Sequence, residues 1–221
     1  MFLLSFRRFE EIPRVTGVMD GKRKNGTTGR NESAHTNGNP ARALPVISLF
    51  SGSGGLDLGF STAGFTPILA IDVNAAACLT YERNHAGTRV LKRDLSDLPK
   101  RYVLERLSEL ADGVKPIGVV GGPPCQAFSQ GNGHKRDDDP RALLSKNYAA
   151  ILRELNAAFN LDFFVFENVL GLKQKRHDEQ FKLFKRLFAA AGFRIFEAEL
   201  NAYDFGVAQV RKRLFIVGLS R

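Results

Sequence analysis

The sequence predicts a doubly wound α/β fold, in which a mostly parallel sheet carries helices on both faces. Short apolar runs of strand length alternate with longer segments whose apolar residues recur at helical spacing, and this alternation is typical of βαβ units. A glycine-rich turn directly follows the first apolar run. Polar residues follow several later runs, so we expect them at the carboxyl edge of the sheet, where open α/β proteins bind ligands.

The first half of the chain is predicted to contain four strands and three helices. The strands are expected over 45–50, 67–71, 88–91 and 117–120, and the helices over 56–63, 74–84 and 100–111. The first helix is expected to end at Gly64, because glycine adopts the left-handed conformation that ends many helices. Cys78 lies among alanines in the second helix and is predicted to be a core residue rather than a reactive one.

The second half of the chain is predicted to add two helices and three strands. The helices are expected from Pro140 onward and over 179–191, and the strands over 163–166, 193–200 and 214–219. Proline suits the first turn of a helix, because the N–H that it lacks has no helical partner there. The phenylalanines of the last helix share a face with Leu187, so we expect them in the core rather than stacked on bases.

Composition indicates one folded domain and a basic tail. The domain is predicted over 44–221, while residues 1–43 are polar and unpatterned and are expected to be disordered. The tail is either a basic arm that binds phosphate or an idle extension. The net charge of +9 is expected for a protein with a polyanionic partner. The two cysteines are too few for a disulfide framework, which favours a reducing compartment such as the cytoplasm. No apolar run approaches the length that a membrane-spanning helix requires.

A stiff turn after the strand at 117–120 carries the second cysteine of the chain. Two glycines and two prolines, Gly121 to Pro124, precede Cys125; glycine frees φ and proline fixes it. A thiol at the carboxyl end of a buried strand is held rigidly and remains accessible, as a nucleophile must be. Taken alone, this pattern fits either a catalytic thiol or a small packing residue.

Four motifs together resemble those of the DNA (cytosine-5) methyltransferases. They are Pro124-Cys125-Gln126, Phe50-Ser51-Gly52-Ser53-Gly54-Gly55, Glu167-Asn168-Val169 and Gln209-Val210-Arg211-Lys212-Arg213, which occur in the order found in that family. The resemblance runs from Pro45 to Ser220 and implies a Rossmann-like methyltransferase sheet. Family members usually have proline where this chain has Ala208, a departure that loosens one turn.

The resemblance implies S-adenosylmethionine as the cofactor. The glycine-rich turn would form a cradle, because glycines let the backbone approach a ligand and the helix N-terminus presents N–H groups. Asp72 would bind the ribose hydroxyls and Asp94 the adenine amino group, with helix capping as the alternative for both. The cofactor-binding residues implied are Phe50, Ser51, Gly52, Gly54, Gly55, Leu56, Asp72, Val73, Asp94, Leu95, Gly122 and Pro124. No metal site is expected, because no Cys/His pair stands at ligand spacing.

The resemblance also implies methyl transfer to carbon 5 of a cytosine flipped out of duplex DNA. Cys125 would add to the ring as a thiolate, helped by the positive charge of Arg211 or Arg213. Glu167 would act on ring N3, and we expect apolar surroundings that keep it protonated. The residues implied to contact the substrate are Gln126, Ser129, Asn168 and Gln209.

Other functions stay open at this point. They are a dinucleotide-dependent oxidoreductase, against which the glycine spacing argues, a regulatory subunit without catalysis, and a tRNA methyltransferase of the same family. Family members carry a target-recognition region beyond the motif that ends at Arg213, and this chain ends at Arg221. We therefore expect either a truncated protein or half of a split enzyme completed by a second polypeptide. Either form should bind DNA weakly and in a salt-sensitive way, with negligible site-specific methylation alone.

Overall fold

The computed structural model describes residues 44–96, 101–110, 113–124 and 140–221. All of them belong to one compact unit, Ala43–Arg221. The tail expected over 1–43 lies outside the described residues, and so does the segment 125–139. None of the helices in the described part of the chain has the length and apolar character that crossing a membrane would require.

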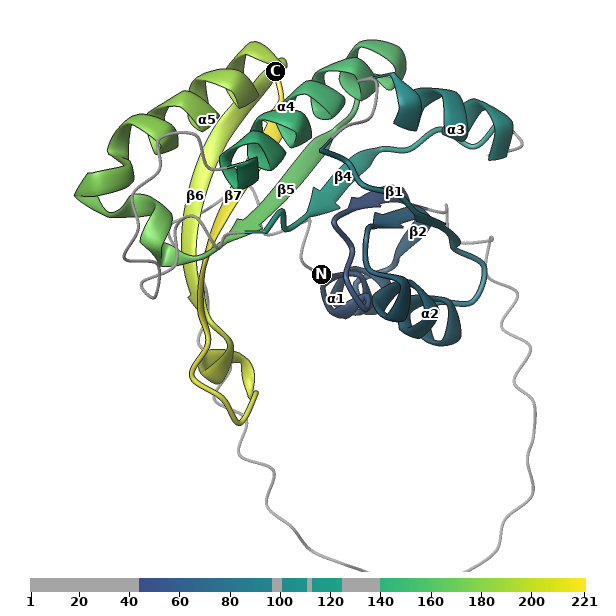
Figure 1. The fold of residues 1–221 in the computed structure, drawn as a ribbon, viewed down its shortest axis with the longest axis horizontal. Coiled ribbons are helices and arrows are strands. Elements are labelled where there is room, and N and C mark those ends of the chain that lie inside the picture. Colours follow the sequence, from purple (N-terminus) through teal and green to yellow (C-terminus); the bar gives the residue numbers. More distant parts are fainter. Residues whose placement is uncertain (1–43, 97–100, 111–112, 125–139) are drawn as a thin grey trace, which may run out of the picture. The chain divides into compact units, whose positions relative to one another are not determined.

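The described residues form a seven-stranded sheet with the order β3-β2-β1-β4-β5-β7-β6 (Figure 1). The strands are β1 Leu44–Leu49, β2 Phe65–Asp72, β3 Arg89–Lys92, β4 Gly118–Gly121, β5 Phe163–Asn168, β6 Phe193–Asn201 and β7 Lys212–Ser220. Strands β1 to β5 pair in parallel, whereas β7 is antiparallel to both β5 and β6. This order confirms the predicted doubly wound, mostly parallel fold, and it places the topological switch point between β1 and β4.

Five α-helices in the described residues cover the two faces of this sheet. They are α1 Gly55–Thr62, α2 Ala75–Asn84, α3 Tyr102–Leu110, α4 Pro140–Phe159 and α5 Asp178–Ala190. Figure 1 shows α3, α4 and α5 on one side of the sheet and α1 and α2 on the other. Three short 3-10 helices, Leu170–Lys173, Lys175–His177 and Ala202–Phe205, were not expected from the sequence.

An aromatic core fills the space between the sheet and helices α4 and α5. Phe164 and Phe166 point to this face of β5, since alternate residues of a strand face the same side. The Phe188 ring lies 4.7 Å from Phe164 and 5.3 Å from Phe166, measured between ring centroids. Each fully buried phenylalanine stabilises the fold by about 1.5–3 kcal/mol. The helix α5 phenylalanines, including Phe184, are therefore core residues, as predicted.

The antiparallel strand β7 brings the end of the chain to the carboxyl edge of β5. In its register Glu167 pairs with Phe215 and Asn168 with Leu214. The strand predicted over 163–166 consequently continues to Asn168, because β7 supplies backbone partners for two more residues. Arg213, which precedes Leu214, is thus carried beside Glu167.

Candidate active site

The glycine-rich turn between β1 and α1 is held in a strained shape. Phe50 has a φ of 54°, a left-handed conformation that non-glycine residues rarely adopt and that clusters at functional sites. The Ser51 N–H donates to the Ile71 carbonyl of β2 at 3.1 Å, and the Gly54 N–H donates to the Ser51 carbonyl at 3.1 Å. Gly54, with a φ of 88°, is the N-cap of α1. The turn is therefore fixed against the end of the neighbouring strand.

Asp72 ties the end of β2 to this turn. Its Oδ2 accepts a hydrogen bond from the Gly52 N–H at 2.8 Å, and its Oδ1 accepts one from the Asn74 N–H at 2.8 Å. The helix-capping alternative for Asp72 is not what the structure shows, because Asn74 is the N-cap of α2 and accepts from the Ala77 N–H at 3.0 Å. A carboxylate has about four acceptor positions, so Asp72 retains capacity for ligand hydroxyl groups.

The turn has the features of a cradle for a polar ligand with an apolar part. The Ser51 hydroxyl oxygen is buried and has no hydrogen-bond partner among the described residues. Buried polar atoms are normally paired, so this atom fits a ligand contact. Val73 stands next to Asp72 with its side chain 60% exposed, and open space surrounds Gly52 and Gly55. These observations fit the residues predicted to bind the cofactor.

The residues predicted to bind the cofactor differ in exposure at Asp94, Leu95 and Leu56. The Asp94 side chain accepts from the Ser96 N–H at 2.8 Å, and this hydrogen bond holds the pKa of that exposed carboxyl below its usual value. Leu95 is buried in the hydrophobic core. Leu56, in the first turn of α1, is half-buried. Asp94 thus offers a charged acceptor, and Leu95 is part of the core beside it.

Glu167 and two arginines come together at the end of β5. Glu167 Oε1 lies 2.9 Å from Arg213 Nε and 3.8 Å from an Arg211 guanidinium nitrogen. The expectation of apolar surroundings for Glu167 is wrong, because β7 pairing carries both cations beside a side chain that is 23% exposed. A methyl group added to Gly122 would lie 2.8 Å from Glu167 Oε2. The carboxyl therefore sits against the turn that leads from β4 to Cys125.

The remaining predicted residues divide into three groups. Cys125, Gln126 and Ser129 lie outside the described residues. Asn168, expected to contact the substrate, is completely buried; its Oδ1 accepts from the Val169 N–H at 2.9 Å, and its Nδ2 has no partner among the described residues. Asn168 is therefore placed to shape the turn after β5. The residues Gln209 and Pro124 are exposed, and Gly122 is half-buried.

Cys78 is a core residue, as predicted. Its side chain is 5% exposed, and its thiol donates to the Asp72 carbonyl at 3.6 Å. Burial raises the pKa of the Cys78 thiol above its usual value, and the nearby Asp72 charge adds to this effect. Both the low accessibility and the raised pKa disfavour reaction at this thiol.

A buried acid, Asp57, lies beneath the glycine-rich turn and was not anticipated from the sequence. It is fully buried in the first turn of α1, and its Oδ2 accepts from the Ser48 hydroxyl at 2.8 Å. Burial raises the pKa of Asp57, while the Ser48 hydrogen bond, His85 and Tyr81 oppose that rise. An acidic residue among the apolar positions of α1 was the available signal, but α1 is too short for its periodicity to indicate which residues are buried.

Replacing Asp57 with asparagine should change how stability depends on pH. Because the folded pKa is raised, the wild-type fold loses stability as pH rises through the unfolded value towards the folded one. Asparagine does not titrate, so it escapes this loss. Thermal unfolding of both proteins from pH 4 to pH 7 is expected to show that the stability of the variant rises relative to that of wild type as pH rises. A difference that stays constant across this range would contradict the buried, titrating carboxyl.

Substituting Gly54 with alanine is expected to destabilise the fold, whereas the same change at Gly55 is not. A Cβ at Gly54 would overlap the His85 ring and would stand at a φ of 88°. The left-handed conformation and the overlap together should lower the free energy of unfolding by about 2–4 kcal/mol. Gly55 has neither constraint, so its alanine variant should remain within about 0.5 kcal/mol of wild type. Urea unfolding of the pair measures this; equal stabilities would contradict the described turn.

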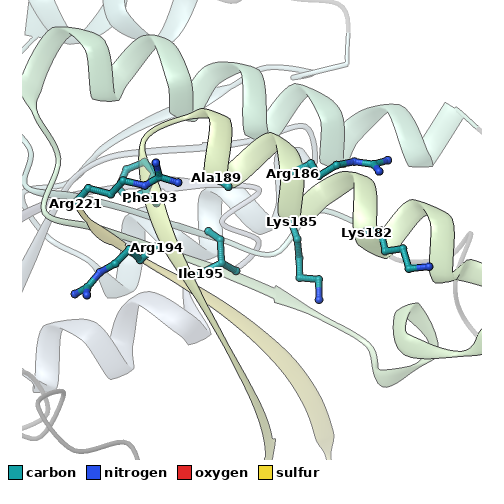
Figure 2. A pocket seen from close by; sticks show the side chains of 8 residues that line it. All are labelled: Lys182, Lys185, Arg186, Ala189, Phe193, Arg194, Ile195 and Arg221. Atoms are coloured by element: carbon teal, nitrogen blue, oxygen red, sulfur yellow. The ribbon is translucent and has the colours of Figure 1, made fainter.

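A separate hollow of about 600 Å³ lies over α5 and the start of β6 (Figure 2). It is lined by Lys182, Lys185, Arg186, Ala189, Phe193, Arg194, Ile195 and Arg221. Lys182 pairs with Asp178 at 2.7 Å and Lys185 with Glu197 at 2.8 Å, so part of its positive charge is balanced. Since β6 runs in the direction of β5, its first residue lies at the opposite sheet edge from Glu167. None of the predicted site residues that the structure describes lines this hollow.

Comparison with known proteins gives a consistent result. A sequence model of the family described as C-5 cytosine-specific DNA methylase matches residues 44–221. The chain is 39% identical to the type II methyltransferase M.FnuDI of Fusobacterium nucleatum, over 80% of this chain and 47% of that protein. It is 36% identical to the type II methyltransferase M.AquIA of Picosynechococcus sp., over 78% of this chain and 71% of that protein.

Among solved structures, the chain is similar to a DNA modification methyltransferase encoded within a prophage (E. coli). The TM-score is 0.65 at 30% sequence identity, and the match covers 80% of this chain and 47% of that one. The chain spans about half the length of several relatives that it matches, M.FnuDI among them.

Proposed function

The chain belongs to the C-5 cytosine-specific DNA methylase family, and from this we propose that it transfers a methyl group from S-adenosylmethionine to carbon 5 of cytosine in DNA. The observation that carries the proposal is the position of Glu167. It lies between Arg213, at 2.9 Å, and the Gly122 turn that leads to Cys125. The glycine-rich turn and Asp72 lie at the same carboxyl edge of the sheet, so a cofactor and a base could meet there.

We propose that S-adenosylmethionine binds along the ends of β1, β2 and β3. When bound, it supplies an electrophilic methyl group. Asp72 would accept hydrogen bonds from the ribose hydroxyls and Asp94 from the adenine amino group. The Ser51 hydroxyl, buried without a partner among the described residues, would bond the amino-acid end of the cofactor. The remaining contacts would come from Phe50, Gly52, Gly54, Gly55, Leu56, Val73, the backbone of Leu95, and Gly122 with Pro124.

We propose covalent catalysis, because carbon 5 of cytosine is a weak nucleophile. The Cys125 thiolate would form a bond to ring carbon 6, and the displaced electron pair would make carbon 5 nucleophilic. After carbon 5 has taken the methyl group, loss of its proton to a base would return the electron pair and break the carbon–sulfur bond. The thiolate is then regenerated.

Glu167 would stabilise the charge that reaches ring N3 during this addition. Arg213 engages Oε1, which leaves Oε2, on the Gly122 side, to share a proton with N3. A fixed arginine also prevents the carboxyl from rotating away, so the oxygen is positioned before the base arrives. Arg211, at 3.8 Å, would add positive charge near both the thiolate and the phosphate backbone. Gln126, Ser129 and Gln209 remain proposed substrate contacts, and Asn168 would act through the turn.

Duplex DNA is the proposed partner. The net charge of +9 suits a polyanion, and reaction at carbon 5 requires the cytosine to leave the base stack. No comparison supports the second polypeptide considered from the sequence, so the proposal is limited to DNA.

Transfer of an isotope-labelled methyl group to mixed-sequence duplex DNA tests the proposal. The DNA is digested to nucleosides, and the labelled nucleoside is identified by mass spectrometry. Labelled 5-methylcytosine is expected, at a slow rate and without a defined sequence for the purified chain. Label on adenine N6 or cytosine N4, or no label from a chain that binds the cofactor, would contradict the proposal.

A further inference from the structure

The His85 imidazole reaches the glycine-rich turn from its buried side. His85 Nε2 lies 3.0 Å from the Gly54 carbonyl oxygen, and the His85 side chain is buried. A carbonyl oxygen only accepts hydrogen bonds, so the ring must carry a proton on Nε2. The same carbonyl accepts from the Leu58 N–H at 2.9 Å. His85 therefore attaches to the residue at which the turn becomes α1.

The imidazole packs closely against Tyr81 and Gly54. The fully buried Tyr81 ring stacks on it, with ring centroids 4.3 Å apart and an angle of 30° between the planes. The His85 ring, together with the edge of the Tyr81 ring, occupies the space that a side chain at Gly54 would need. The Tyr81 carbonyl also accepts from the His85 backbone N–H at 2.9 Å. The backbone of His85 is thus bonded to the end of α2, while its ring contacts the glycine-rich turn.

A second buried contact attaches the same segment to the sheet. The Ser48 hydroxyl on β1 donates to Asp57 Oδ2 at 2.8 Å, and both residues are buried. This bond joins the strand before the turn to the helix after it. Tyr81 and His85 both act to lower the pKa of the Asp57 carboxyl, so the Ser48–Asp57 pair lies close to the two rings that pack at the turn.

We propose that the His85–Gly54 and Ser48–Asp57 contacts form a buried lock that fixes the turn Ser51–Gly55 in its ligand-binding shape, with His85 as a positioning residue. Asp72 clamps the exposed side of the same turn through Gly52, but the proposed ribose contact uses that carboxylate too. His85, Ser48 and Asp57 act from the buried side of the turn and are not among the proposed ligand contacts. That the ligand is S-adenosylmethionine rests on the proposed function. The proposal that the buried contacts fix the turn does not depend on which ligand binds.

Two variants separate the hydrogen bond from the packing of the ring. His85→Phe keeps an aromatic ring against Tyr81 but removes the donor to Gly54. His85→Gln keeps a donor near the Nε2 position but loses the ring. Thr80→Ala is the control, because the exposed Thr80 hydroxyl on the same helix bonds only the Ala76 carbonyl of that helix. Each protein is examined by amide hydrogen exchange without ligand and by calorimetric titration with S-adenosylmethionine.

His85→Phe is expected to speed exchange at the Gly52, Gly54 and Leu58 amides by about tenfold and to weaken S-adenosylmethionine binding by about five- to tenfold. Exchange at the Val165 amide in β5 should not change, His85→Gln should recover most of both losses, and the control should match wild type. Unchanged exchange at the turn in His85→Phe, or uniformly faster exchange throughout the fold, would overturn the lock. If wild type failed to bind S-adenosylmethionine, the proposed function would fail, and the exchange results alone would still decide the lock.

Discussion

Replacing Cys125 with serine is expected to abolish methyl transfer while leaving S-adenosylmethionine binding intact. A serine hydroxyl is far less acidic than a thiol, so it provides almost no anion to add to ring carbon 6 at neutral pH. Without that addition, carbon 5 stays a weak nucleophile. The proposed cofactor contacts, Gly122 and Pro124 included, do not involve the Cys125 side chain, so calorimetry should give the wild-type dissociation constant.

The covalent step can be observed directly with duplex DNA that contains 5-fluorocytosine. Fluorine at carbon 5 cannot leave as a proton does, so the protein–DNA bond should persist and survive denaturing electrophoresis. Wild type and Cys78→Ser are expected to form the adduct, because the Cys78 thiol is buried against Asp72. Cys125→Ser is expected to form none. An adduct in that variant, or its loss in Cys78→Ser, would show that Cys125 is not the nucleophile.

Glu167→Gln should lower the rate of methyl transfer by about 10²- to 10⁴-fold, the usual contribution of a positioned proton donor or acceptor. Glutamine preserves the shape of the side chain and can still accept from Arg213, which now donates to Oε1 at 2.9 Å. It cannot share a proton with ring N3. The rate constant for transfer should therefore fall, while the dissociation constant for S-adenosylmethionine stays near the wild-type value.

Glu199→Gln is a matched control for that variant. Glu199 lies on β6 and pairs with Lys173 at 2.6 Å on the exposed surface, where such pairs contribute little to stability. Single-turnover transfer of a labelled methyl group compares the two variants with wild type. Equal rates for Glu167→Gln and Glu199→Gln would remove Glu167 from the chemistry.

The order of the elements could be predicted from the sequence because each strand is a short apolar run with turn residues at its ends. All seven strands in the described residues begin and end within two residues of the predicted limits. The positions of the glycine-rich turn and of Asp72 at the carboxyl edge were also predictable, since the turn directly follows the first strand and Asp72 ends the second. The predicted sheet was mostly parallel, but the antiparallel insertion of β7 between β5 and β6 was not predicted, because the periodicity of single segments carries no information on strand pairing.

The side-chain environments were not predictable in the same way. Glu167 was expected in apolar surroundings, but the register of β7 against β5 places Arg213 at its carboxyl. That register depends on backbone pairing between segments more than 40 residues apart, which local sequence does not encode. Similarly, the contact of His85 with Gly54 joins residues 31 positions apart, and neither residue carries a local signal of it.

The carboxyl ends of β1, β2 and β3 are proposed to bind S-adenosylmethionine, and calorimetric titration of wild type and Asp72→Ala tests this binding most directly. Removing a carboxylate that accepts two ribose hydroxyls should weaken binding by about 10- to 100-fold, while an unchanged circular dichroism spectrum shows that the variant is folded. S-adenosylhomocysteine keeps the ribose and adenine, so its affinity for Asp72→Ala should fall by the same factor. Failure of wild type to bind either compound, or equal affinities for wild type and a folded Asp72→Ala, would contradict the account.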